Sequence, residues 1–372
     1  MLSTRAKTLV RKFKDHLIFI GPDVWGEHEN PLFTEDKKLY PEWKKAALEE
    51  GVPVRIGRWE VPGNPIAVLV DFQPFFAQKN EIYGRAWELF RVDSLHAYGD
   101  YDEASMFSYA AGRFAAALCK HCFAGRKIIY QAHEWMSGLG MLFLQHECPE
   151  VRTIFTTHAT SIGRSIAGNN KLLYAYFKGY NGDQMAAELS MEAKHSIEKQ
   201  SAHRCDCFTT VSEFTDAECA QLLDKPADVV LPNGFELDFV PKGAELKKKR
   251  AAARRRIFDI AEALTGETYA DDTMIISTSG RNDFRCKGFD VYLESMRRLN
   301  EQLRGSQRKV LSLIEVPCWL LGPREDLRAR LADEKALRSH AYTTPLPTPM
   351  ITHDLHNLNE DRILCLIKDL GL

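Results

Sequence analysis

Residues 151–164 read Val-Arg-Thr-Ile-Phe-Thr-Thr-His-Ala-Thr-Ser-Ile-Gly-Arg, an apolar run typical of a buried strand followed by a polar loop. A second segment of this kind starts at Met274, where an apolar run leads into Ser-Gly-Arg-Asn-Asp-Phe-Arg-Cys-Lys-Gly at residues 279–288. Each loop precedes a helical pattern, and open α/β folds bind their ligands at the carboxyl ends of parallel strands. With His158 and the spaced cations Arg164, Arg281 and Lys287 among their residues, the two loops predict an anionic ligand held from two sides.

Length and composition indicate an ordinary two-domain protein. A chain of 372 residues is long for one hydrophobic core, and 45% hydrophobic with 27% charged residues is typical of globular proteins. The formal net charge of −2 favours neither nucleic acid nor a membrane surface as a partner. We find no signal peptide pattern in residues 1–15 and no apolar stretch near the roughly 20 residues of a spanning helix. Nine cysteines suit a reducing compartment, so we expect a cytoplasmic protein.

Strand and helix patterns alternate along the first two thirds of the chain. We expect a basic amphipathic helix over 4–14, a helix over 101–122, and a helix opened by a capping box at Thr215-Asp-Ala-Glu218. The expected strands cover residues 17–20, 54–59, 66–72, 127–132, 151–155, 207–211 and 229–231. This alternation predicts one doubly wound parallel sheet from about residue 15 to 235, and we expect the strand at 127–132 to be buried.

The composition changes beyond Gly234, and a second alternation follows. A strand near 274–279, a helix over 288–304 and a strand over 309–316 predict another α/β domain, with a proline-containing loop over 341–351. We place the domains at 1–237 and 238–372. Residues 247–256 carry seven cations on an expected helix. A solvated helix face is the favoured interpretation of that run, and a polyanion site is the alternative.

The chain resembles the glycogen synthase family, and the compact bacterial members in particular. The resemblance rests on a string of segments in the family's order: His133-Glu-Trp-Met-Ser-Gly138, Phe155 to Arg164, Phe208-Thr-Thr-Val-Ser212, Leu231-Pro-Asn-Gly234, Ser279-Gly-Arg281, Lys287-Gly288, Thr352-His353 and the final Leu-Gly-Leu. Their order and spacing hold along most of the chain, which chance explains poorly.

The resemblance implies a retaining glucosyltransferase with two facing Rossmann-like, doubly wound parallel-sheet domains (GT-B type). Arg281 and Lys287 would bind the nucleotide diphosphate, and His158 and Arg164 would contact the sugar side from the other domain. We therefore expect His158, Arg281 and Lys287 to be catalytic and Arg164 to bind substrate.

His133 and Glu134, at the end of an expected strand, are candidates for the acceptor side of the site. A purely structural role in the strand-end turn is the alternative. His158, Arg164, Arg281 and Lys287 also have a plain alternative as ordinary hydrogen-bonding or ion-pairing residues.

Cations suit this chemistry because negative charge develops on the departing phosphate oxygens. No motif supplies the carboxylate nucleophile that many retaining glycosidases use. The resemblance implies that the leaving phosphate itself helps to deprotonate the incoming hydroxyl. We expect neither a metal nor a cofactor besides the donor. Cys119-Lys-His-Cys122 and His203-Arg-Cys-Asp-Cys207 lack zinc-site spacing, which favours buried single cysteines.

By the same resemblance the donor is UDP-glucose or ADP-glucose, the acceptor is the end of an α-1,4-glucan such as glycogen, and the assembly is a homo-oligomer. In the family, a first strand and a glycine-rich loop precede the segment that resembles residues 2–9. The family's acidic motif follows the position that corresponds to residue 372. We therefore expect a chain truncated at both ends, with an incomplete second domain. The alternative function is an inactive fragment or a glucan- or nucleotide-binding remnant.

Overall fold

The computed structural model describes residues 2–26, 28, 30–237 and 240–372. The chain divides into two compact units, Met1–Glu236 and Leu237–Leu372, and each is described by itself. Among the described residues, no helix is both long and apolar enough to cross a lipid bilayer.

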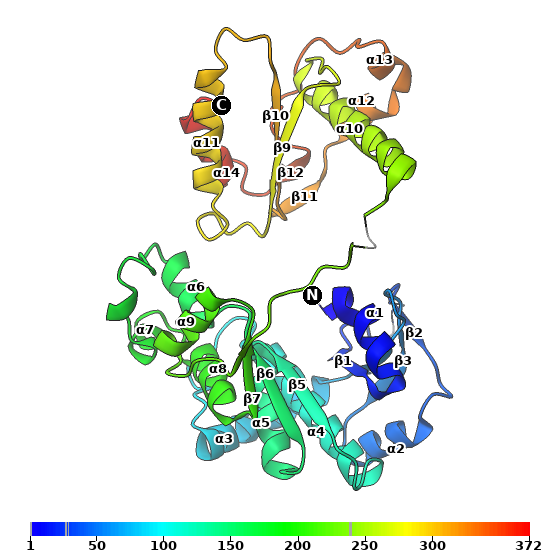
Figure 1. The fold of residues 1–372 in the computed structure, drawn as a ribbon, viewed down its shortest axis with the longest axis vertical. Coiled ribbons are helices and arrows are strands. Elements are labelled where there is room, and N and C mark those ends of the chain that lie inside the picture. The colour runs from blue at the N-terminus through cyan, green and yellow to red at the C-terminus, as the bar shows by residue number, and fades with distance from the viewer. Residues whose placement is uncertain (1, 27, 29, 238–239) are drawn as a thin grey trace. The chain divides into compact units, whose positions relative to one another are not determined.

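The first unit contains two four-stranded sheets, covered by helices (Figure 1). Its first part comprises α1 Leu2–Phe13, β1 Ile18–Pro22, β2 Phe33–Glu35, α2 Pro41–Glu49, β3 Val54–Trp59, β4 Ile66–Val70, α3 Lys79–Phe90 and α4 Tyr101–His121. Its second part comprises β5 Ile129–His133, α5 Gly138–Glu147, β6 Arg152–Thr156, α6 Ser161–Gly168, α7 Gly182–Glu188, α8 Glu192–Arg204, β7 Cys207–Thr210, α9 Glu213–Leu222 and β8 Val229–Val230.

The α/β class and the parallel pairing are confirmed, but the expectation of one parallel sheet over residues 15–235 is wrong. The first sheet has the order β1-β4-β3-β2 and is mixed. Strand β1 runs parallel to β4, whereas β3 runs antiparallel to both β4 and β2. The Pro62-Gly63-Asn64 turn explains this, because a short connection can join only antiparallel neighbours.

The second sheet, β5-β6-β7-β8, is parallel throughout and matches the predicted alternation (Figure 1). Its strand β5 is not buried as expected, because it lies at an edge and only Ala132 is fully enclosed. The capping-box prediction is also wrong. The N-cap of α9 is Ser212, whose side chain accepts from the backbone N–H of Thr215, so the helix begins earlier than the sequence suggested.

The main core of the first unit joins the mixed sheet to α2, α3, α4, α5 and α8, and it is rich in aromatic rings. Within it α4 and α5 approach so closely that a Cβ on Gly112 would overlap the backbone carbonyl of Gly140. A smaller cluster packs Phe155 of β6 and Phe208 of β7 against Met141 of α5. Packing against the helices thus holds the parallel sheet rigidly. This packing fixes the positions of the carboxyl ends of its strands.

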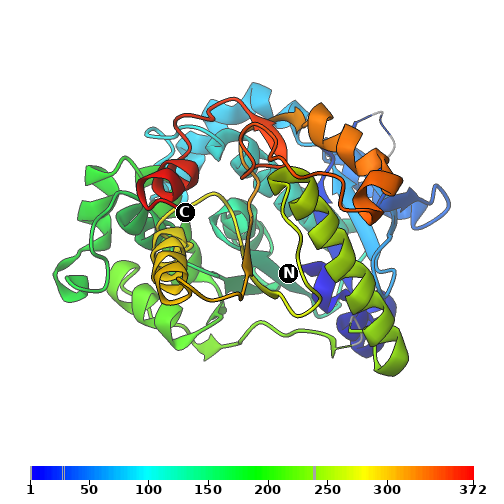
Figure 2. The ribbon, with the colours of Figure 1, turned by 90° about the horizontal axis from the view of Figure 1, so that it is seen from above.

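The second unit has a helix–sheet–helix arrangement. It comprises α10 Gly243–Thr265, β9 Met274–Ser279, α11 Phe289–Gln302, β10 Val310–Glu315, β11 Leu320–Pro323, α12 Glu325–Ala332, α13 Glu334–Arg338, β12 His353–Leu355 and α14 Arg362–Asp369. Strands β9 and β10 are parallel, with α11 and α14 on one side and α10, α12 and α13 on the other (Figures 1 and 2). Phe289 and Leu293 of α11 form one core with Ile363 of α14, and Leu264 of α10 forms another with Leu327 of α12.

The cationic run lies on α10 as expected, and its side chains are exposed apart from the half-buried Arg254. Two of its charges are neutralised within the helix, through Lys249 with Glu245 and Arg255 with Asp259. This exposure agrees with a solvated helix face.

We predict that Gly112→Ala destabilises the protein by about 3 kcal/mol, because the added methyl forces the α4 and α5 backbones apart. The matched control is Gly84→Ala in α3, where no atom lies within 4 Å of the added Cβ. That change should be neutral or stabilising by about 0.5–1 kcal/mol through helix propensity. Urea denaturation of both variants tests the packing, and equal effects would contradict it.

Candidate active site

The register of the parallel sheet brings His133 and His158 together. His133 is the last residue of β5 and pairs with Thr156, the last residue of β6, and His158 follows two residues later. Nδ1 of His133 lies 3.2 Å from Nε2 of His158, and the two rings are nearly parallel with centroids 5.5 Å apart. Two residues separated by 25 positions therefore form one pair because neighbouring parallel strands end at the same edge.

Glu134 and Arg164 lie beside this pair. Nη2 of Arg164, in the first turn of α6, is 3.7 Å from Oε1 of Glu134. The backbone of Glu134 has φ 64° and ψ 166°, a conformation that residues with a Cβ rarely adopt. Its N–H nevertheless donates to the carbonyl of Thr156 at 2.8 Å, so the sheet holds the strained residue in place. Strain of this kind is common where a side chain must be aimed at a site.

Both histidines are neutral at neutral pH. Burial, with smaller contributions from His158 and Arg5, lowers the pKa of His133 to about 4. Burial, Arg5 and Arg164 likewise hold the pKa of His158 below its usual value. In a neutral pair one ring donates its N–H to the other. Nδ1 of His158 is enclosed and has no hydrogen-bond partner among the residues that the structure describes, so it retains capacity for one more bond.

The sequence did not indicate Arg5 as part of this region. Its Nη2 donates to Oδ1 of Asn233 at 3.2 Å, and Thr8 one turn later donates to Oε1 of Glu236 at 2.6 Å. These bonds hold α1 on the segment that follows β8. They join residues 228 positions apart, and no spacing rule connects such residues. A cation from α1 thereby lies close enough to influence both histidines.

Buried glutamates that the sequence also did not single out anchor the loop carrying His158. Thr160 caps α6, and its Oγ1 accepts from the N–H of Gly163 at 3.2 Å. The same hydroxyl donates to Oε2 of Glu218 on α9 at 2.8 Å, and Tyr174 donates to Oε1 of Glu218 at 2.6 Å. Glu198 of α8 accepts hydrogen bonds from Thr157 and Ser161 of the same segment.

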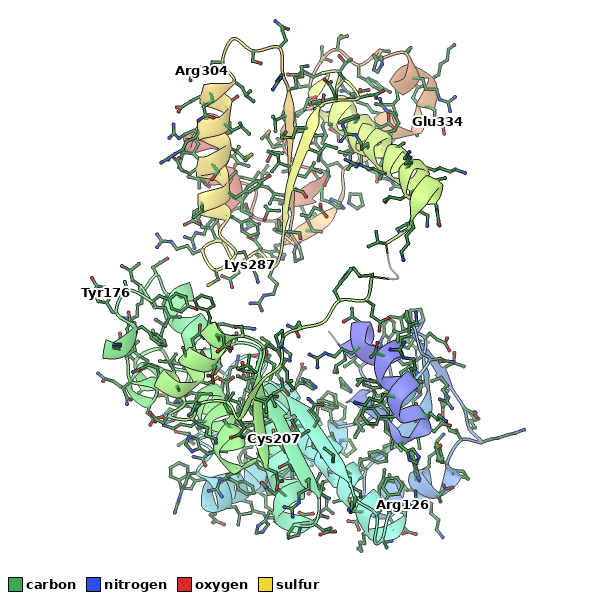
Figure 3. All side chains as sticks on the ribbon, in the orientation of Figure 1. Arg126, Tyr176, Cys207, Lys287, Arg304 and Glu334 are labelled. Carbon is green, nitrogen blue, oxygen red and sulfur yellow. The ribbon has the colours of Figure 1, made fainter. Side chains whose placement is uncertain are left out.

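In the second unit, Arg281 and Lys287 lie on one loop between β9 and α11, as predicted. Lys287 lies at the loop end of α11 (Figure 3), and its aliphatic stem packs 3.2 Å from the place a Cβ on Gly280 would occupy. Arg281 is 63% exposed, and its Nη2 lies 3.5 Å from Oδ2 of Asp283. Exposed cations beside a helix N-terminus suit a phosphate ligand.

Asn282 ties this loop to the rest of the unit. Its Nδ2 donates to Oδ2 of Asp361 at 3.2 Å, while Oδ1 of Asp361 caps α14 through the N–H groups of Ile363 and Leu364. The structure thus assembles His133, Glu134, His158 and Arg164 in the first unit and Arg281 with Lys287 in the second. Their functional roles stay predictions.

Polar loops at the carboxyl ends of parallel strands, one in each unit, define an α/β protein of the class that binds ligands at strand ends. The sequence profile described as glycogen synthase matches residues 1–325, and this chain belongs to the glycogen synthase family.

Curated relatives include the glycogen [starch] synthase of Neurospora crassa, 29% identical over 85% of this chain and 46% of that protein. Isoform 2 of Saccharomyces cerevisiae is 26% identical over 100% of this chain and 55% of its own length. The human liver enzyme is 29% identical over 82% of this chain and 44% of its own length. The chain therefore spans about half the length of the curated relatives it matches.

A solved structure that aligns with the chain is an α,α-trehalose-phosphate synthase (UDP-forming) from Burkholderia xenovorans in complex with glucose-6-phosphate. It is 13% identical, covers 87% of this chain and 70% of its own, and has a TM-score of 0.42.

We predict that the depressed pKa of His133 makes the protein less stable in acid. The unfolded chain has an ordinary histidine pKa near 6.5 and takes up a proton first, so stability falls between pH 6.5 and about 4 and is restored as pH rises. The loss is about 3 kcal/mol for a shift of this size. Urea denaturation across this pH range should show a flatter profile for His133→Asn than for the wild type. Replacement of the exposed His16 by Asn is the control, and an unchanged profile in His133→Asn would contradict the prediction.

We also predict that Glu134→Gly is more stable than Glu134→Ala by about 1–2 kcal/mol. Both substitutions remove the carboxylate, but only glycine removes the Cβ that the positive φ disfavours. At Lys120, an exposed position late in α4, the order should reverse, with glycine less stable than alanine by about 1 kcal/mol. Midpoints of chemical denaturation for the four variants provide the measurement. Alanine equal to or better than glycine at residue 134 would argue against strain.

Proposed function

We propose that this protein is a glycogen synthase that transfers glucose, with retention of configuration, from a nucleotide-glucose to the non-reducing end of an α-1,4-glucan. The observation that carries the proposal is the family match over residues 1–325. This match includes both loops, the one with His158 and the one with Arg281 and Lys287.

The cations of the second unit support a role in binding the donor's diphosphate. Arg281 offers a planar fork and Lys287 a compact charge, and both can stabilise the diphosphate as its bond to glucose breaks. The N-terminus of α11 follows directly and favours negative charge as well. The departing phosphate then assists deprotonation of the acceptor hydroxyl, and the proposal includes neither a metal nor a further cofactor.

Neutral histidines suit the sugar side of the reaction. Because the pKa of His158 is lowered, its ring can line the sugar side without adding a positive charge near the reacting carbon. Arg164 contacts the same side. His133 and Glu134 complete the acceptor side, since both lie at the same sheet edge as His158.

The donor is UDP-glucose or ADP-glucose, and we propose a homo-oligomer in the cytoplasm. All nine cysteines are free thiols, which supports a reducing compartment.

We predict that Arg281→Ala, Lys287→Ala and His158→Ala each reduce glucose transfer by about 10²–10³-fold, because each removes a fixed group aimed at the transition state. The assay measures transfer from radiolabelled UDP-glucose and ADP-glucose to glycogen. It uses the 372-residue chain. Arg304→Ala, an exposed arginine just beyond α11, is the matched control and should retain wild-type activity.

Transfer from one donor only would identify the nucleotide. A folded protein that binds glucan but transfers no glucose from either donor would contradict the proposal and favour the non-catalytic remnant.

A further inference from the structure

Glu198 is a fully buried carboxylate in the middle of α8, with 0% of its surface exposed. It accepts three hydrogen bonds, all from the loop that follows β6. Oε1 accepts from the hydroxyl of Thr157, and Oε2 accepts from both the N–H and the hydroxyl of Ser161 at 2.7 Å. The two oxygens therefore hold the loop on both sides of His158.

This arrangement is costly for stability alone. A carboxylate loses its hydration when buried, and an apolar residue of similar volume often serves a core equally well. Here three donors and the N-terminus of α6, which begins at Ser161, offset part of this cost, although burial still keeps the pKa of Glu198 above its usual value. Each donor belongs to the segment that carries His158, so the compensation also fixes the backbone on both sides of the histidine.

Glu218 provides a comparison within the same region. It is also largely buried and also contacts the loop, but its partners are the hydroxyl groups of Thr160 and Tyr174. It has no bond to Thr157 or Ser161 among the described contacts. Loss of Glu218 therefore removes the contact to Thr160 and leaves the three Glu198 bonds to Thr157 and Ser161 in place.

We propose that Glu198 is a positioning residue for the candidate active site: its carboxylate clamps Thr157 and Ser161 and thereby holds the ring of His158 against His133. The inference deepens the proposed glucosyl transfer and rests on it, because the clamp preserves the position of the His158 ring on the proposed sugar side. Displacement of a site residue by about 1 Å can reduce a rate by about 100-fold.

The substitution series follows from the hydrogen-bond chemistry. In Glu198→Gln the amide oxygen can accept from Ser161 while the amide N–H₂ donates to the hydroxyl of Thr157, which can turn round. The clamp should survive without its charge. Glu198→Ala removes both sides of the clamp, and Thr157→Val removes one side while nearly preserving shape.

The decisive readout is an NMR pH titration of the His158 ring, which does not depend on catalysis. In Glu198→Ala and Thr157→Val the loosened loop admits water, so the pKa of His158 should rise toward the ordinary value of about 6.5. Glu198→Gln should titrate close to the wild type, and so should Glu218→Ala. Where transfer is measurable, kcat should fall by about 10- to 100-fold in Glu198→Ala and recover in Glu198→Gln, with less change in KM.

A folded Glu198→Ala whose His158 titrates as in the wild type would overturn the proposal. Equal shifts in Glu198→Ala and Glu218→Ala would overturn it too, because they would indicate general loosening. If Glu198→Ala does not fold, Thr157→Val decides by the same criterion. An inactive wild-type protein would count against the proposed function alone, since the titration still tests the clamp.

Discussion

In each unit, a buried carboxylate holds the polar loop that carries the candidate site residues. Glu198 clamps the loop after β6, and Asp361 caps α14 while accepting from Asn282 in the loop after β9. Polar loops gain little from hydrophobic packing, so charged hydrogen bonds supply the order that apolar contacts give elsewhere. The same carboxylates are expensive to bury unless every donor is in place. The positions of His158 and Arg281 thus depend on a small number of charged contacts.

The neutral histidine pair is a second consequence of burial. His133 and His158 lie at one edge of a rigid parallel sheet, and their surroundings disfavour a positive charge on either ring. Arg5 strengthens this effect from α1, which is itself anchored to Asn233 and Glu236. At this edge of the sheet the positive charges are those of Arg5 and Arg164, while the two histidines are neutral and hydrogen-bond to each other. Because the folded protein disfavours a positive charge on His133, acid lowers its free energy of unfolding.

Local patterns predicted most of the elements because periodicity and turn residues act over a few positions. The strand–loop–helix of residues 151–164 and the α10 and α11 helices appeared where expected. Three expectations failed, and the burial of β5 failed for a non-local reason. Strand β5 is apolar enough for a core but lies at an edge, β3 reverses direction, and α9 uses Ser212 as its cap. Strand order and direction depend on partners that a single segment does not encode.

The sequence by itself determined the secondary structure, the family resemblance and the chemistry of the loops around His158 and Arg281. These features are written in contiguous residues, so a strand, its polar end and the following helix can be recognised together. Only the tertiary structure decided that His133 pairs with His158, that Arg5 lies near both, and that Glu198 clamps Thr157 and Ser161. Those contacts join residues tens to hundreds of positions apart, and sheet register and helix packing alone bring them within hydrogen-bonding or charge-interaction range.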